Sequence, residues 1–253
     1  MLNYVEYGKE NKYDDDIFFQ KYSQMSRSQQ GLAGAGEWKT LRKLLPDFKD
    51  KRVLDLGCGY GWHCIYAMEH GASSVVGVDI SHKMLEVAKE KTHFPQVEYK
   101  CCAIEDVEFP EESFDVILSS LAFHYVADYE ILVKKIYRIL KSGGKLVFTV
   151  EHPVFTAYGT QDWYYNEKGE ILHFPVDNYY YEGKRTAVFL GEKVTKFHRT
   201  LTTYLNTLLS NGFIINHIVE PQPPEYMMDI PGMQDEMRRP MMLIVSANKK
   251  VDR

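Results

Sequence analysis

The chain has 253 residues, which is enough for one sizeable domain with insertions. Its 45% apolar and 26% charged residues are ordinary for a globular protein, and its net charge of −5 argues against a dedicated nucleic-acid surface. The four cysteines form no C-x-x-C pair, which favours a reducing cytoplasm over a zinc site or a disulfide framework. No stretch approaches the roughly 18 apolar residues of a membrane span. We therefore expect a cytoplasmic protein that has no metal and no membrane or nucleic-acid partner.

The first 46 residues are predicted to form a helical leader. They are mostly polar with scattered aromatic residues, and they include a glycine-rich joint at 31–36. Trp38, Leu41 and Leu44 follow a helical spacing before Pro46 stops the helix.

From residue 47 onward, strands alternate with helices. Apolar runs predict strands at 52–57, 74–79, 97–101, 114–119 and 145–150. Helices are predicted at 61–70, from 81, and from 128 to a glycine C-cap at 142–144. This alternation indicates an α/β core over 47–150, with a parallel sheet covered by helices on both faces.

The alternation breaks after residue 150. The segment 151–194 is rich in aromatic residues and turn signals, so hairpins or irregular structure are expected there. A helix at 197–211, a strand at 213–219, a Pro- and Met-rich loop at 221–240 and a strand at 241–247 follow. The last two strands have no helix between them and should pair antiparallel. Residues 195–253 would then complete the same sheet.

A glycine turn follows the first predicted strand and opens the first helix of the core. Gly57, Gly59 and Gly61 alternate in the chain, which allows the backbone to turn tightly and to approach a ligand. The start of the helix presents free N–H groups there. Asp79 ends the second strand, where a carboxylate can accept hydrogen bonds from ribose hydroxyls. With the loop at 103–110, these features predict a nucleotide-type cofactor site.

Two details weigh against a dinucleotide. The turn reads G-x-G-x-G, whereas the dinucleotide fingerprint is G-x-G-x-x-G. Asp55 lies two residues before the turn, where it would repel a pyrophosphate but suits a ligand with an ammonium group. A nicotinamide-dependent oxidoreductase is therefore the less favoured interpretation.

Five motifs, at 53–61, 76–81, 105–115, 121–126 and 140–146, resemble those of class I S-adenosylmethionine-dependent methyltransferases of the small-molecule, type 11 group. The resemblance implies a Rossmann-like, doubly wound seven-stranded sheet of order 3-2-1-4-5-7-6 with the last strand antiparallel. It implies S-adenosyl-L-methionine as cofactor, S-adenosyl-L-homocysteine as product and a small-molecule acceptor, in a monomer or weak homodimer. The leader would be a lid over the cofactor or a plainly packed segment. A non-catalytic cofactor-binding regulator stays open.

The cofactor residues expected from the turn and the resemblance share one edge of the sheet. They are Tyr22, Asp55, Gly57, Cys58, Gly59, Gly61, Trp62, Asp79, Ile80, Met84, Ile104, Glu105, Asp106, Ser119 and His124. Family members often carry an acid where Ala103 stands, so Glu105 or the backbone at Ile104 must meet the adenine amino group.

Methyl transfer to a reactive sulfonium depends mainly on alignment and desolvation, and a base is needed only for a protonated nucleophile. His124 and His152 follow strands four and five and are the candidate catalytic residues, as bases or as hydrogen-bonding groups. For Glu151 a cap or a salt bridge is the favoured role. The aromatic insert at 151–194 would cap the substrate, or bury its rings on the sheet edge. The predicted substrate-binding residues are Tyr125, His152, Tyr179, His198 and Arg199.

Overall fold

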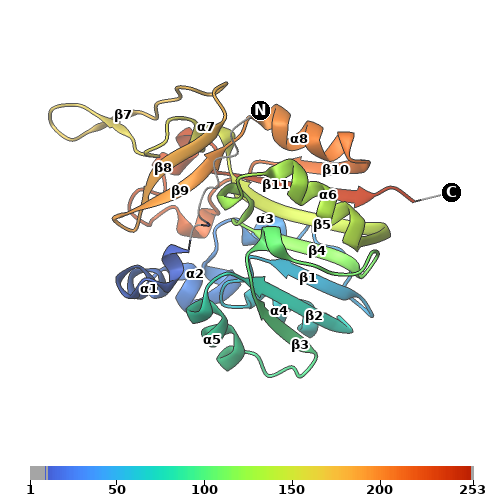
Figure 1. Cartoon of the computed structure of the whole chain (residues 1–253). Helices are drawn as coiled ribbons and strands as arrows, with labels where there is room; N and C mark the ends of the chain where they lie inside the picture. The colour runs from blue at the N-terminus through green and yellow to red at the C-terminus, as the bar shows by residue number, and fades with distance from the viewer. Residues whose placement is uncertain (1–8, 10, 252–253) are drawn as a thin grey trace.

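The core of the protein is one seven-stranded sheet (Figure 1). The computed structural model describes residues 9 and 11–251. The strand order is β10-β11-β5-β4-β1-β2-β3; β11 runs antiparallel to both neighbours, and the other pairs are parallel. The predicted order and the antiparallel last strand are confirmed. The strands are β1 (Arg52–Leu56), β2 (Ser74–Asp79), β3 (Val97–Cys101), β4 (Phe114–Ser120), β5 (Leu140–Glu151), β10 (Phe213–Val219) and β11 (Met242–Lys249).

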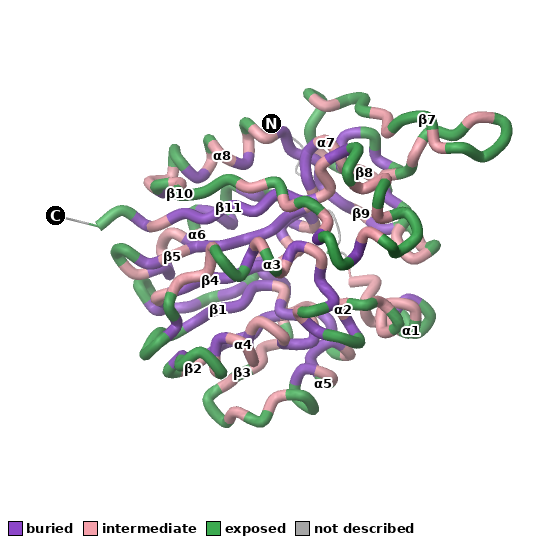
Figure 2. The backbone as a smooth tube through the Cα atoms, turned by 180° about the vertical axis from the view of Figure 1, so that it is seen from behind, coloured by how far each residue is buried: buried purple, intermediate pink, exposed green. Residues whose placement is uncertain are grey.

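Helices cover both faces of this sheet because its central strands are apolar on both sides. Val53 packs into the apolar cluster of one face, and its neighbour Leu54 packs into that of the other. Figure 2 shows the central strands as a continuous buried region. One face carries α3 (Trp38–Leu41), α4 (Trp62–Glu69) and α5 (His82–Lys91), and the other carries α6 (Tyr129–Ile139) and α8 (Leu201–Ser210).

The leader forms two short helices, α1 (Asp16–Ser23) and α2 (Ser26–Gln29), between 3₁₀ turns at Lys12–Asp14 and Gly31–Gly34. The helix predicted from Trp38 through Leu44 is shorter than expected. It ends at Leu41, and residues 42–44 form a turn. Residues 1–8 and 10 of the predicted leader lie outside the described part of the chain.

The hairpins predicted between residues 151 and 194 are present. After α7 (Pro153–Ala157), β6 (Tyr164–Tyr165) pairs with β7 (Ile171–His173), and β8 (Gly183–Phe189) pairs with β9 (Glu192–His198). Because β9 extends to His198, the helix predicted at 197–211 begins only at Leu201. The Thr200 side chain caps it by accepting a hydrogen bond from the backbone of Thr203 (3.1 Å).

The glycine C-cap predicted at 142–144 is wrong. Helix α6 ends at Ile139, and β5 begins at once with Leu140. The pairing with β4 then jumps from Phe114–Leu140 to Val116–Lys145, so residues 141–144 bulge out of the ladder. The glycines serve this bulge, since Gly143 has a φ of +73°.

Candidate functional site

A cavity of about 370 Å³ lies at the carboxyl ends of β1, β2, β4 and β5, where the strand order reverses. The leader and the β8–β9 hairpin cover it, and Figure 1 shows α1 beside this hairpin. Phe18 of α1 is fully buried against Ala187 and Val194 of the hairpin. The Lys21 ammonium also donates to the carbonyl of Leu190 at the hairpin tip (3.0 Å). The two covering segments therefore meet each other above the sheet.

The cavity lining includes two groups of residues, one near the end of β2 and one near the end of β5. The β2 compartment is lined by Gly57, Gly59, Asp79, Ile80, Met84, Ala103, Ile104 and Glu105. The β5 compartment is lined by His124, Tyr125, Glu151, Phe155, Gln161, Val188, Phe189, Lys196, Met241 and Met242.

Glycine is required at the three positions of the turn for different physical reasons. A Cβ on Gly57 would lie 2.4 Å from the Cβ of Ala122, and one on Gly61 would lie 2.2 Å from the hydroxyl of Tyr99. Both glycines therefore allow close packing. A Cβ on Gly59 would meet nothing within 4 Å, although its φ of +52° still favours glycine. Gly59 lines the cavity, so a side chain there would extend into open space of the β2 compartment.

The carboxylate of Asp79 is fixed at the end of β2 by two backbone donors. The N–H of Gly59 donates to one oxygen (2.8 Å), and the N–H of Ser81 donates to the other (2.9 Å). Burial raises the pKa of Asp79, and these N–H donors act against that rise. Each carboxylate oxygen keeps a further lone pair, so Asp79 can still accept hydroxyl groups. Ile80 and Met84 provide apolar wall beside it.

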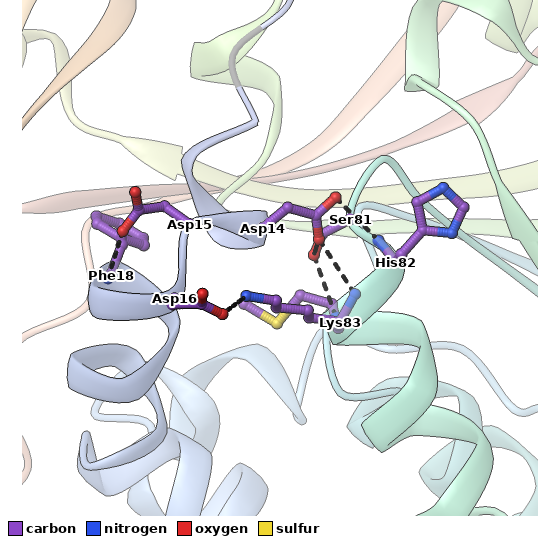
Figure 3. Close-up of polar contacts among 8 residues, drawn as sticks. Asp14, Asp15, Asp16, Phe18, Ser81, His82 and Lys83 are labelled. Atoms are coloured by element: carbon purple, nitrogen blue, oxygen red, sulfur yellow. Dashed lines mark hydrogen bonds and ion pairs between the residues drawn. The ribbon is translucent and has the colours of Figure 1, made fainter.

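The leader is fastened to the first turn of α5 (Figure 3). This turn lies next to Asp79, which accepts from the N–H of Ser81. The carboxylate of Asp14 accepts hydrogen bonds from the hydroxyl of Ser81 (2.6 Å) and from the backbone N–H groups of Lys83 (3.1 Å) and His82 (3.4 Å). Ser81 in turn accepts from the N–H of Met84 (3.2 Å), so free donors of this helix start are satisfied. Burial raises the pKa of Asp14, but the Ser81 and backbone hydrogen bonds bring it below its usual value. An ion pair between Asp16 and Lys83 adds to this attachment.

In the β5 compartment, three side chains form a closed polar set: Glu151, Gln161 and Lys196. The Lys196 ammonium contacts the Glu151 carboxylate (2.5 Å) and donates to the Gln161 side-chain carbonyl (2.9 Å). The Gln161 amide donates back to the other Glu151 oxygen (2.6 Å). The lysine side chain is only 3% exposed. Burial raises the pKa of Glu151, but the charges of His124 and Lys196 and the hydrogen bonds bring it below its usual value.

His124 is buried at the same compartment. The backbone N–H of Glu151 donates to its Nδ1 (3.4 Å), so the hydrogen of the neutral ring lies on Nε2. Burial lowers the pKa of His124 to about 4, although the Glu151 charge acts in the opposite direction. At neutral pH the ring thus offers a hydrogen-bond donor. The base role predicted for His124 has no support in this arrangement.

The second predicted catalytic residue, His152, does not line the cavity. Its Nδ1 accepts from the N–H of Val154 at the start of α7 (3.0 Å), and its Nε2 lies 2.8 Å from the Glu220 carboxylate. Burial lowers its pKa, against the charge of Glu220. His152 therefore caps α7 and connects it to the loop after β10.

The remaining predicted substrate residues, apart from Tyr125, also lie outside the cavity lining. The His198 ring is held between the hydroxyl of Thr156 (2.7 Å) and the carbonyl of Tyr179 (2.8 Å). The Arg199 guanidinium donates to backbone carbonyls after β4, including that of Ala127 (3.0 Å). These residues hold the insert against the core. The exposed rings of Tyr164, Tyr165, Tyr180 and Tyr181 likewise do not line the cavity.

Nine of the predicted cofactor residues line the cavity: Tyr22, Gly57, Gly59, Asp79, Ile80, Met84, Ile104, Glu105 and His124. Cys58 and Trp62 line a smaller hollow of about 70 Å³ that shares Gly57 and Gly59 with the cavity. Four others lie outside both linings: Asp55, Gly61, Asp106 and Ser119.

Asp55 lies beneath the glycine turn, contrary to its expected place at the ligand. It is 1% exposed, and the thiol of Cys64 donates to its carboxylate (3.5 Å). Burial raises the pKa of Asp55 to about 7, and the Cys64 hydrogen bond acts against this rise. Ser119 is buried too, and its hydroxyl donates to the carbonyl of Leu56 (2.7 Å).

Sequence reasoning missed several lining residues: Tyr13, Met25, Arg27, Ser120, Gln161, Phe189 and Lys196. Arg27 forms a two-pronged ion pair with Glu37 (both contacts 3.0 Å) and lines both hollows. Tyr13, Met25 and Arg27 belong to the leader that was expected as a lid, but no motif assigned any of the seven residues to the cavity lining.

Comparison with known proteins connects this geometry to a family. The profile of the type 11 methyltransferase domain matches residues 54–148. A solved structure from Listeria monocytogenes, provisionally described as an S-adenosylmethionine-dependent methyltransferase, is 58% identical, with a TM-score of 0.83, over 87% of this chain and 99% of its own. An uncharacterised Haemophilus influenzae protein is 34% identical over 94% of this chain and 96% of its own. The chain belongs to the class I S-adenosylmethionine-dependent methyltransferases.

Two further relatives agree with this methyltransferase assignment. An S-adenosylmethionine-dependent methyltransferase from Mesorhizobium loti is 41% identical, with a TM-score of 0.80, over 86% of this chain and all of its own. A ubiquinone biosynthesis O-methyltransferase of Coxiella burnetii is 36% identical over 112 residues, 44% of this chain and 47% of the relative.

The cofactor of this methyltransferase is therefore S-adenosylmethionine. The β2 compartment fits it: Asp79 offers acceptors for the ribose, Ile80 and Met84 offer apolar surface, and Gly59 leaves space. Among the described residues, no helix is both long and apolar enough to cross a membrane.

Proposed function

We propose that this methyltransferase transfers the methyl group to a small molecule in the β5 compartment. The observation that carries the proposal is that one cavity includes both compartments and is covered by the leader and the hairpin. A volume of about 370 Å³ is typical of small-molecule sites. The Coxiella burnetii relative, named as an O-methyltransferase of ubiquinone biosynthesis, also supports a small acceptor.

The chain's own residues have distinct proposed roles. The bound cofactor supplies a methyl group on a reactive sulfonium, and Asp79 would hold its ribose. The leader, through Tyr13 and Tyr22, would be a lid that excludes water from the reacting groups. The His124 Nε2–H would donate a hydrogen bond that orients the acceptor.

No general base is assigned. His124 offers a donor, and Glu151 is engaged by Lys196 and Gln161. We therefore propose that the rate comes from alignment and desolvation, with a nucleophile that arrives with a free lone pair. The protein is proposed to be a monomer or a weak homodimer in solution. Light scattering on the purified protein measures this oligomeric state directly.

Calorimetry tests the cofactor site first. S-Adenosylhomocysteine should bind the cofactor-free protein with a stoichiometry of one per chain. An acceptor library is then incubated with cofactor carrying a radioactive methyl group, and methylated product is measured. Failure to bind S-adenosylhomocysteine would contradict the proposal. Binding without turnover of any acceptor class would instead favour a non-catalytic regulator.

A further inference from the structure

The β5 compartment carries no net charge. Among its described lining residues, Glu151 and Lys196 are the charged side chains, and they form an ion pair with each other. The neighbouring His124 ring is neutral at pH 7. An acceptor with a net charge would therefore meet no uncompensated side chain in this compartment, which makes its desolvation costly.

The polar set of Glu151, Gln161 and Lys196 still has hydrogen-bonding capacity beyond its mutual bonds. Those bonds use two of the three ammonium hydrogens and one of the two amide hydrogens. Each carboxylate oxygen keeps a further lone pair. All three side chains line the cavity, so donors and acceptors lie side by side in a wall that also includes the apolar Phe155 and Phe189.

Two observations suggest that this set serves binding more than stability. A buried ion pair is often no more stable than apolar residues of similar volume, so folding does not demand it. In addition, Gln161 has a φ of +63°, a strained conformation for a residue other than glycine. Such strain concentrates at functional sites, where surrounding contacts hold it in place. Here the contacts are the hydrogen bonds to Glu151 and Lys196.

We propose that the methyl acceptor is an uncharged, mainly apolar molecule whose one polar edge both donates and accepts hydrogen bonds, such as a carboxamide or lactam. Glu151 would accept from that edge, and Lys196 or Gln161 would donate to it. These three residues are then the specificity determinants of the acceptor. This inference rests on the proposed function, because it concerns the acceptor end of the same cavity.

The test uses the full chain saturated with S-adenosylhomocysteine and three probes of similar size: benzamide, benzoate and benzylamine, which is protonated at pH 7.5. Calorimetry or ligand-observed NMR measures the dissociation constants. Benzamide should bind at least about tenfold more tightly than either ion, which is the least expected from one hydrogen bond to a charged group.

Two variants sharpen the test. The double variant Glu151→Gln with Lys196→Met removes both charges together, and it should lower the preference for benzamide over the ions at least about threefold. The control, Lys193→Met, removes an exposed lysine from the same strand and should leave the preference unchanged. A folded double variant with unaltered preference would overturn the proposal.

The other outcomes are also decisive. Tighter binding of benzoate would mean that Lys196 acts as an uncompensated cation, and tighter binding of benzylamine would mean that Glu151 acts as an uncompensated anion. Either result would overturn the proposal, as would failure of all three probes to bind. If S-adenosylhomocysteine itself does not bind, the proposed function fails instead.

Discussion

Breaking the Glu151–Lys196 ion pair should destabilise the fold in a pH-dependent way. In Lys196→Met, the Glu151 carboxylate, whose side chain is only 15% exposed, loses its cation. Removing one partner of a buried pair costs about 3–5 kcal/mol, so we expect a loss of about 3 kcal/mol in the free energy of unfolding at pH 8. The double variant with Glu151→Gln removes the orphaned charge and should lie within about 1 kcal/mol of the natural protein.

The pH dependence follows from the pKa of the Glu151 carboxyl group, which differs between the natural protein and Lys196→Met. In the natural protein the pKa of Glu151 is lowered, against its burial, so its contribution is present above the usual 4.5 and is lost as the pH falls through the lowered value. In Lys196→Met, burial without the ammonium raises that pKa, so the penalty grows as the pH rises above 4.5. Urea unfolding of the three proteins at pH 5 and pH 8 measures the second effect. Equal stability of the single and double variants at pH 8, or a pH-independent gap, would refute the reasoning.

Three further predictions concern the other parts of the site. Gly59→Val should weaken S-adenosylhomocysteine binding at least about 100-fold, since an occupied subsite loses several contacts; Gly169→Val, at an exposed glycine with a φ of +78° and open space, controls for backbone strain and should bind normally in the same calorimetry. Asp14→Ala should cost about 1 kcal/mol in urea unfolding through the lost helix cap and should weaken cofactor binding, whereas Asp177→Ala in the exposed insert should do neither. The His124 ring should titrate near pH 4 in NMR spectra assigned with His124→Gln. Because the ring of the unfolded chain takes up its proton near pH 6.5, this residue should make the free energy of unfolding fall as the pH drops from about 6.5 towards 4. A titration midpoint near pH 6.5 would disprove the argument that burial lowers this pKa.

The sheet and the glycine turn were predictable because they depend on local patterns. Apolar runs and turn residues mark the strands, and the sites at their carboxyl ends follow from parallel pairing. It was harder to predict on which side of the sheet a single residue at a strand end lies. Neighbouring residues of a strand point to opposite sides, so Glu151 faces the cavity while His152 faces away. An error of one residue was therefore enough to place His152 at the cavity in the prediction, where its neighbour Glu151 lies in the structure.

The leader and the insert were expected to cover the site, but the individual contacts that place them were beyond prediction for a different reason. Their position depends on a few contacts between residues far apart in the chain. Asp14 meets Ser81, and Phe18 meets the β8–β9 hairpin. No local pattern specifies such pairs, so Tyr13, Gln161 and Lys196 could not be assigned to the cavity from the sequence. The bulge at 141–144 was predicted as a helix end because a glycine pair is compatible with either structure.

The reversed direction of β11 separates the two ends of the last strand by function. Met242 starts this strand at the cavity, and Lys249 ends it at the opposite end of the strand, away from the cavity (Figure 1). A linker attached after residue 251 would therefore tether the enzyme to a solid support through the end of β11 that lies away from the cavity. By contrast, changes in the loop just before β11 would reshape the wall that meets the acceptor. The same strand thus offers one end for immobilisation and the other for redesigning specificity.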